Sequence, residues 1–332
     1  MPATERFLVT GALGCIGAWT VRELVREGTP VVAFDLAADP RRLRLIMSPD
    51  ELGAVTFATG DIAETATIPD LLDEHGITHI VHLAALQIPF CRADPPLGAR
   101  VNVVGTINVF EAARRRLDQV RGLVYASSIA VFDAADADAR TGIVSDDDAG
   151  HPTTHYGVYK QANEGNARVY WQEGGLASVG LRPMTVFGVG RDQGLTSAPT
   201  RAVVAALLGR PFEIGFSGRT LFQYTADVGR TFVMAARRGL DGARIFNLGG
   251  SNAAIADVVA AIETAVPEAA GLIRITGDPL PFPDRIDASG ADALGPLPVT
   301  PIGSAVAQTV DLLRALQADG RLDPLEHGLP AA

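Results

Sequence analysis

The stretch FLVTGALGCIGAWTVREL, residues 7–24, joins a short apolar run to an amphipathic segment through Gly11, Gly14 and Gly17. The run predicts a buried strand, and the segment near 16–27 predicts a helix. Glycine suits a turn that takes positive φ, that lets backbone approach a diphosphate, and that packs a helix closely on a strand. The N-terminus of that helix offers free N–H groups to an anion. The stretch therefore predicts a dinucleotide-binding turn.

A second apolar run, VVAFDL, ends at Asp35. An acidic residue there accepts hydrogen bonds from the adenosine ribose and repels a 2′-phosphate, which favours NAD over NADP. The alternative for Asp35 is a helix N-cap or a loop charge. Arg41 and Arg42 lie farther on and could blur the choice. Cys15 and Ile16 lie inside the glycine turn and are expected at the cofactor, Cys15 as a small packed residue.

Apolar runs alternate with helix-like segments through the first half of the chain. This order predicts an α/β fold with a parallel sheet covered on both faces. Strands are expected at Phe7–Thr10, Val31–Phe34, Val55–Thr59, His79–Leu83, Leu123–Ala126 and Ser178–Arg182, and helices near 16–27, 98–117 and 157–173. The acidic segment 133–150 is expected to be a loop.

Prolines interrupt the pattern after about residue 185, which indicates a smaller lobe. Helices are expected there near 197–208, 253–265 and 302–317. We therefore expect a dinucleotide-binding domain over 1–185 and mainly a substrate-binding lobe over 186–332. A later strand near 244–248 could complete the sheet.

Composition narrows the class of protein. The 332 residues are 47% hydrophobic and 20% charged, with a net charge of −10 and no basic block, so neither nucleic acid nor a membrane is expected as a partner. No apolar run reaches the length of a membrane span, and the N-terminus lacks the features of a secretion signal. Only Cys15 and Cys91 occur, which fits a reducing cytoplasm. No residue cluster has metal-ligand spacing, so no metal is expected.

The stretch HYGVYKQANEGNARVYW, residues 155–171, places Tyr156 and Lys160 four residues apart. On a helix this spacing puts both side chains on one face, one turn apart. Because Tyr and Lys at this spacing occur by chance in many chains, the pair alone is weak evidence for an acid/base pair, and two residues that merely occupy a helix start are the better reading of it.

Further stretches follow in order: GDIAE (60–64), HLAA (82–85), VNVVGTINVFEAA (101–113), YASSIAVF (125–132) and LRPMTVFG (181–188). With the glycine turn and the Tyr156–Lys160 pair, they make the chain resemble the extended short-chain dehydrogenase/reductase family, which contains NAD-dependent sugar epimerases and dehydratases. The resemblance covers nearly the whole chain. It implies a Rossmann-type doubly wound parallel sheet with a smaller C-terminal substrate-binding lobe, and NAD as the cofactor.

The resemblance also implies roles for residues. Ser128 would be the catalytic hydroxyl, with Ser127 as the competing choice; Tyr156 would be the acid/base, and Lys160 its partner and a ligand of the nicotinamide ribose. Near the cofactor, it implies Asp61 and Ile62 at the adenine, Leu83, Ala84 and Ala85 along the cleft, Asn102 as a buried structural or cofactor-side residue, and Pro183 by the nicotinamide.

The chemistry is consistent with those roles. Oxidation of a secondary alcohol removes a proton from oxygen and a hydride from carbon. A nearby ammonium and a positive nicotinamide favour the phenolate of a tyrosine whose ordinary pKa is about 10. Ser128 could orient the reacting oxygen.

The chain departs from the nucleotide-sugar enzymes where they bind the diphosphate. Thr185 stands where an Asn is common, and Thr220 where an Arg is common; Arg219, Arg285 and Arg191 are alternative partners for that diphosphate. A diphosphate rewards bidentate arginines, so a small substrate without a nucleotide is favoured: a sugar, sugar acid or polyol. Candidate substrate contacts are Gln87, Ser128, Thr185, Arg191, Arg219 and Gln223.

The leading interpretation is an NAD-dependent dehydrogenase of carbohydrate metabolism. The alternative is an epimerase of a sugar or nucleotide sugar that keeps its NAD. A dehydratase is disfavoured because Ile129 and Ala130 follow Ser128, where that branch has an Asp-Glu pair. A non-catalytic NAD-sensing protein is a weaker alternative, because Tyr156 and Lys160 are both present. By family analogy, the helices near 98–117 and 157–173 would pair in a homodimer.

Overall fold

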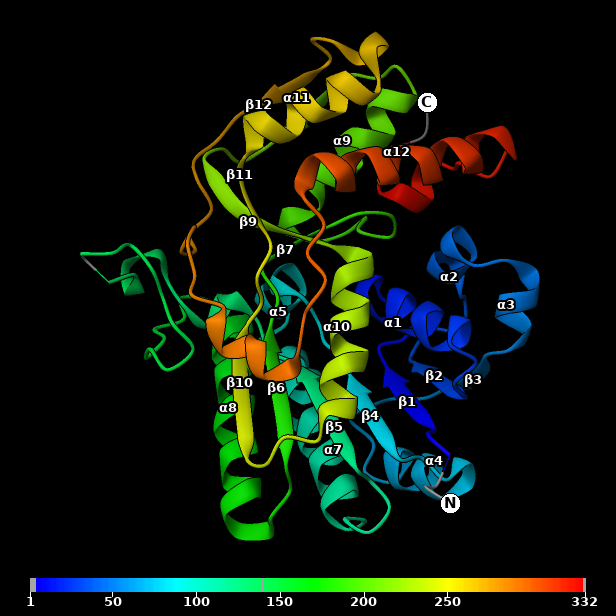
Figure 1. Cartoon of the computed structure of the whole chain (residues 1–332), viewed down its shortest axis with the longest axis vertical. Coiled ribbons are helices and arrows are strands. Elements are labelled where there is room, and N and C mark those ends of the chain that lie inside the picture. Colours follow the sequence, from blue (N-terminus) through cyan, green and yellow to red (C-terminus); the bar gives the residue numbers. More distant parts are fainter. Residues whose placement is uncertain (1–3, 139, 331–332) are drawn as a thin grey trace.

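A seven-stranded parallel sheet forms the centre of the protein, in the order β10-β6-β5-β4-β1-β2-β3 (Figure 1). The structure is a computed structural model and describes residues 4–138 and 140–330. The strands of the sheet are β1 (Phe7–Thr10), β2 (Val31–Asp35), β3 (Thr56–Thr59), β4 (His79–His82), β5 (Gly122–Ala126), β6 (Ser178–Arg182) and β10 (Ala243–Asn247). The predicted α/β class and Rossmann-type sheet are confirmed.

Helices cover both faces of this sheet. Side chains alternate along each strand, so Phe7 and Val9 of β1 join the core under α1 and α10, whereas Leu8 joins the core under α4, α7 and α8. The helices are α1 (Cys15–Arg26), α2 (Arg41–Ile46), α3 (Pro49–Gly53), α4 (Thr67–His75), α5 (Ile88–Ala93), α6 (Pro95–Ala99), α7 (Gly105–Arg114), α8 (His155–Gly174), α9 (Ala198–Leu207), α10 (Thr225–Arg238), α11 (Ile255–Ala265) and α12 (Ile302–Ala318).

The six predicted strands are present within one residue at each end, and 133–150 is mainly loop apart from the short 3-10 turn Ala134–Asp136; Ala139 lies outside the described residues. The helix expected over 98–117 is instead α6, a π-helical turn Arg100–Val104, and α7. Asn102 explains the wide turn, because its side chain binds the Leu86 backbone while its carbonyl accepts from Asn163 and Thr106.

The smaller lobe contains the sheet β11-β9-β7 and the pair β12-β8. Its strands are β7 (Thr185–Phe187), β8 (Phe212–Ile214), β9 (Arg219–Tyr224), β11 (Ser251–Ala254) and β12 (Ile273–Ile275). With α9, α11 and α12 they form the upper part of the molecule (Figure 1). However, α10 and β10, which also follow residue 186, belong to the central layer. The division of the chain at residue 185 stays a prediction.

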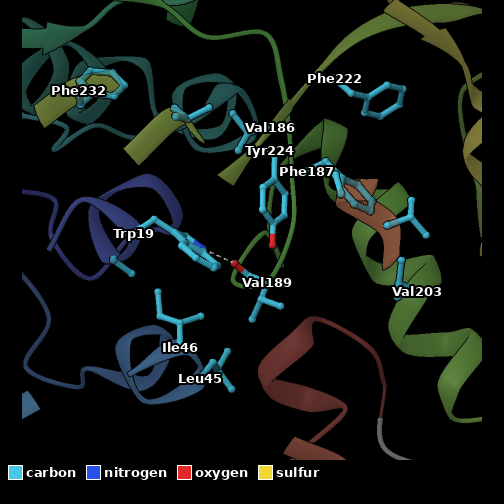
Figure 2. Close-up of a cluster of buried hydrophobic side chains, with 14 of the residues drawn as sticks. Trp19, Leu45, Ile46, Val186, Phe187, Val189, Val203, Phe222, Tyr224 and Phe232 are labelled. Atoms are coloured by element: carbon cyan, nitrogen blue, oxygen red, sulfur yellow. Dashed lines mark hydrogen bonds between the residues drawn. The ribbon is translucent and has the colours of Figure 1, made fainter. Parts of the chain in front are cut away.

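One continuous core joins the two parts. Figure 2 shows Trp19 of α1 between Ile46 of α2 and Tyr224 at the end of β9. The Trp19 indole Nε1 donates a 2.9 Å hydrogen bond to the carbonyl of Val189, in the loop after β7. The loop that leaves β7 is therefore fixed directly to the dinucleotide-binding part.

In the part of the chain that the structure describes, no helix has the length and apolar character needed to cross a membrane.

Candidate active site

A cavity of about 770 Å³ lies at the carboxyl ends of the central strands, where open α/β sheets bind their ligands. It is lined by the turns after the strands from β1 to β6, by the loop after β7 and by the start of α8. It brings together most of the predicted site residues: Gly11, Gly14, Cys15, Ile16, Gly17, Asp35, Asp61, Ile62, Leu83, Ala84, Ala85, Gln87, Ser128, Tyr156, Lys160, Pro183, Thr185 and Arg191.

The glycine turn has the close approaches that its sequence predicts. Gly11 has a φ of 67°, and a Cβ on it would lie 2.6 Å from the Ala84 nitrogen. A Cβ on Gly17 would lie 2.2 Å from the Gly11 carbonyl oxygen. Helix α1 starts after Gly14 with no side-chain cap, so its first N–H groups have no side-chain acceptor and suit a diphosphate.

Asp35 lies beside this turn at the end of β2. Its carboxylate accepts hydrogen bonds from the Leu13 backbone at 2.9 Å and the Ala37 backbone at 3.2 Å. A carboxylate can accept further bonds, so Asp35 can also receive the hydroxyls of an adenosine ribose. This acceptor fits a dinucleotide with a free 2′-hydroxyl.

Arg41 and Arg42 are engaged by a buried acid. Asp192 accepts from Arg41 Nη2 at 2.6 Å and from Arg42 Nη2 at 2.7 Å. Arg42 also donates to the Leu13 carbonyl, and Arg41 to the Glu326 carbonyl. Both guanidinium groups therefore have partners within the protein, and the single carboxylate balances one of their two charges.

Ser127 and Ser128 have different partners. The Ser127 hydroxyl donates at 2.5 Å to the buried Glu164, which also receives two bonds from Arg182 at 2.7 and 2.8 Å. The Ser128 hydroxyl accepts from the Ala130 backbone and hydrogen-bonds Tyr156. Ser128 is thus the serine whose hydroxyl meets the tyrosine.

Tyr156 and Lys160 lie one turn apart at the start of α8, with Lys160 Nζ 5.5 Å from the centre of the Tyr156 ring. Thr154 caps the helix by accepting from the Gly157 backbone at 3.0 Å. A Cβ on Gly157 would lie 2.1 Å from the Ala130 carbonyl oxygen, so glycine lets the helix start touch the Ser128 segment.

Burial shifts the pKa of both groups. It raises the pKa of Tyr156, against the lowering effects of the Ser128 hydrogen bond and the Arg191 charge. It lowers the pKa of Lys160 to about 8. The Lys160 ammonium donates at 2.7 Å to the Ala126 carbonyl, and its remaining N–H groups are available to ribose hydroxyls.

Three predicted residues are not among those lining this cavity. Asn102 has a structural position beside Leu86, as described above. Arg219 is exposed and donates to Asn252, while both ends of the Gln223 amide bind backbone, at Met184 and Leu248. Gln223 instead lines a separate cavity of about 150 Å³.

No sequence motif pointed to Asp192, Glu164 or Trp19. Asp192 reaches Arg41 and Arg42 across 150 residues of chain, and Glu164 reaches Ser127 and Arg182 from another element. Such partners are set by the tertiary fold, and no local spacing reports them.

Residues 7–249 match the model of the NAD dependent epimerase/dehydratase family. The chain belongs to this family. It is accordingly an NAD-dependent enzyme, and the expected cofactor and enzyme class are confirmed.

Individual proteins are similar to this chain over most of its length. A UDP-glucose 4-epimerase from Mycolicibacterium smegmatis is 30% identical over 93% of this chain and 98% of its own. The structure of MoeE5 with UDP-glucuronic acid and NAD is 29% identical, has a TM-score of 0.76, and is matched over 93% of this chain and 99% of its own. An L-threonine dehydrogenase from Cupriavidus necator, at 23% identity, TM-score 0.78 and coverage of 92% and 99%, shows the fold alone.

Proposed function

We propose that the protein oxidises a secondary alcohol of a small polyhydroxylated molecule, such as a sugar, sugar acid or polyol. The observation that carries this is the meeting of Ser128, Tyr156 and Lys160 in the cavity that also contains the glycine turn and Asp35. An alcohol bound beside Tyr156 would lie next to the cofactor.

Each side chain has a role in this proposal. Tyr156 takes the hydroxyl proton of the substrate, and Ser128 orients the reacting oxygen. Lys160 holds the nicotinamide ribose, and its ammonium favours the phenolate of Tyr156. NAD, when bound, supplies the hydride acceptor.

A substrate without a nucleotide is supported by the residues that stand where related nucleotide-sugar enzymes bind the diphosphate. Thr185 and Thr220 are neutral, so neither supplies a positive charge to a diphosphate, and their hydroxyls bond each other at 2.8 Å. Arg219 donates to Asn252, and Arg285 donates to the Thr141 carbonyl. Neither arginine is among the residues that line the cavity.

Absorbance at the NADH band tests this function. Wild-type protein with NAD and a panel of sugars, sugar acids and polyols should produce NADH steadily with at least one compound. Production only with UDP-sugars would overturn the proposal of a small substrate.

An epimerase that keeps its NAD is the second candidate, because the Mycolicibacterium smegmatis UDP-glucose 4-epimerase matches this chain over nearly its whole length. Isomerisation of a sugar or UDP-sugar without net NADH would establish this reading. A non-catalytic NAD-binding role is a third, and turnover of any substrate that requires Tyr156 excludes it.

We propose a homodimer that forms through α7 and α8. Val158 and Val169 are 47% and 44% exposed along α8, and Val104, just before α7, is 42% exposed. Val158→Glu with Val169→Glu should convert a dimer to a monomer in light scattering, and a wild-type monomer would contradict the proposal. A cytoplasmic location is also proposed, and the free thiols of Cys15 and Cys91 support it.

A further inference from the structure

Arg191 is the one arginine lining the cavity, within the described residues, that has no acidic partner. Its Nη2 donates to the Thr196 hydroxyl at 3.0 Å, while its Nε is buried and without a hydrogen-bond partner. The other two arginines of the cavity are paired with Asp192. A buried donor left unpaired is costly, so this arrangement indicates that a ligand completes it.

The loop that carries Arg191 is held in place before any ligand binds. Trp19 binds the Val189 carbonyl, and the neighbouring Asp192 is fixed by the two arginines of α2. The Arg191 backbone N–H donates to the Gly188 carbonyl at 3.1 Å. The guanidinium is thus presented from a fixed backbone, which limits the entropy lost on binding.

Arg191 lies close to Gln87, one of the proposed substrate contacts. A Cβ on Gly194 would be 2.1 Å from Gln87 Oε1 and 3.3 Å from Arg191 Nη2, so these two side-chain ends are neighbours. The Arg191 charge acts on the Tyr156 hydroxyl, and also on the Cys15 thiol beside the glycine turn. An anion bound by Arg191 would therefore be close to the reacting alcohol.

We propose that Arg191, with Gln87 beside it, binds a carboxylate of the substrate, so that the substrate class is a polyhydroxylated acid. A guanidinium matches a carboxylate bidentately, and the amide of Gln87 suits a neighbouring hydroxyl. This inference rests on the proposed function and narrows it from sugars, polyols and acids to the acids. The structure of MoeE5 in complex with UDP-glucuronic acid shows that a protein similar to this chain binds a sugar carrying a carboxylate.

Matched pairs of compounds test the proposal on the NAD-loaded protein: D-galacturonate with D-galactose, D-glucuronate with D-glucose, D-glycerate with glycerol, and UDP-glucuronate with UDP-glucose. The readouts are the melting temperature and the rate of NADH formation. We expect at least one acid to act at about 100-fold lower concentration than its neutral partner. No preference for any acid in either readout overturns the proposal.

Arg191→Met then shows which residue gives the preference. In Arg191→Met the preference for the acid over its neutral partner should fall by about 100-fold, while the Kd for NAD should change less than about threefold. Arg191→Lys should retain part of the preference. Arg274→Met, which removes an exposed charge from β12, is the matched control. If Arg191→Met raises the Kd for NAD by tenfold or more and leaves the preference for the acid intact, the arginine binds the cofactor phosphates and the inference is wrong.

Failure of the proposed function has a different signature. Preference for UDP-glucuronate alone would support the carboxylate site and overturn the small substrate. Acid-dependent stabilisation that needs Arg191, with turnover unaffected by Tyr156→Phe, would support the carboxylate site and overturn the acid/base assignment.

Discussion

The Tyr156 hydroxyl is subject to opposing influences on its proton. Burial raises its pKa, whereas the Ser128 hydrogen bond and the Arg191 charge lower it. A base must be deprotonated to act, so the rate of alcohol oxidation should rise with pH through the pKa of Tyr156 in the working enzyme.

Arg191→Met should therefore move this rise to higher pH. Removal of a cation that favours the phenolate raises the pKa of Tyr156, and more base is then needed to ionise it. The profile of kcat/KM against pH with a neutral substrate checks this, because no carboxylate is then involved. An unchanged or lower midpoint would show that the Arg191 charge does not act on the base.

Lys160 is expected to serve the active site while its buried ammonium lowers the free energy of unfolding. Burial lowers its pKa to about 8, whereas an unfolded lysine titrates near 10.4. Below pH 8 both states hold the proton and the folded state carries the full penalty of a buried ammonium. Between about pH 8 and 10.4 the unfolded state binds more protons, so this penalty is progressively relieved as pH rises.

Lys160→Met should accordingly make the unliganded protein more stable at pH 7, by roughly 1–3 kcal/mol, and less so at pH 10. It should also weaken NAD binding. Urea unfolding at the two pH values and NAD titration give the three quantities. A less stable variant at pH 7 would mean that the hydrogen bond to Ala126 outweighs the burial of charge.

At this scale, most of the residues that motifs single out line the cavity, and their roles stay predictions. Gly11, Asp35, Tyr156 and Lys160 were found because strand ends and helix spacing locate them. The substrate candidates Arg219 and Gln223 do not line the cavity, because Arg219 bonds Asn252 and the Gln223 amide bonds the backbone of Met184 and Leu248, contacts that only the tertiary structure defines.

The start of α8 depends on a close backbone approach at Gly157. Alanine there would bring its Cβ within 2.1 Å of the Ala130 carbonyl oxygen and 2.8 Å of Pro152 Cβ. We expect Gly157→Ala to displace Tyr156 from Ser128 and to lower kcat by about 100-fold.

Gly165→Ala on the same helix is the control. A Cβ there meets nothing within 4 Å, so alanine should stabilise the helix by about 0.5–1 kcal/mol and leave kcat unchanged. Equal activity of the two variants would contradict the role assigned to the approach of α8.

Helix α8 is also tied to β6 and β5 by the buried cluster of Glu164, Arg182 and Ser127. The ion pair is almost fully enclosed, with side-chain exposures of 9% for Glu164 and 5% for Arg182. Glu164→Gln leaves the buried guanidinium uncompensated and should cost about 3–5 kcal/mol of unfolding free energy.

Glu111→Gln tests the same chemistry at an exposed pair on α7, with Arg114, and should cost less than about 1 kcal/mol. Urea denaturation of both variants gives the comparison. Similar losses from the two would mean that burial does not set the strength of the Glu164 pair.

The elements themselves were largely predictable, and the exceptions have physical causes. Inner strands of the parallel sheet such as β1 and β2 are buried on both faces and appear as continuous apolar runs. Helix α10 was not predicted; Gly229, in its middle, lowers the helical signal and instead lets α10 pack against Trp19, where a Cβ would lie 2.8 Å from the Trp19 carbonyl carbon.

On the scale of the whole molecule, the cavity belongs to both parts of the chain. The side with the glycine turn and Asp35 comes from the turns after the first five strands, the side with Arg191 comes from the loop after β7, and the core around Trp19 joins the two (Figure 2). The alternation of strands and helices predicted the first side. The other side depends on contacts between segments that are distant in the sequence. The sequence therefore indicated a smaller lobe but not which of its residues would face the cavity.

The central claim is that this cavity moves a hydride from a substrate alcohol to NAD with Tyr156 as the base. The most direct measurement is steady-state NADH formation by wild type and Tyr156→Phe with the acid that best stabilises the NAD-loaded protein. We predict multiple turnovers of NADH by wild type, a loss of about 10²–10⁴-fold in kcat for the variant, and unchanged NAD affinity. Isomerisation without NADH release, or full activity of the variant, would contradict the claim.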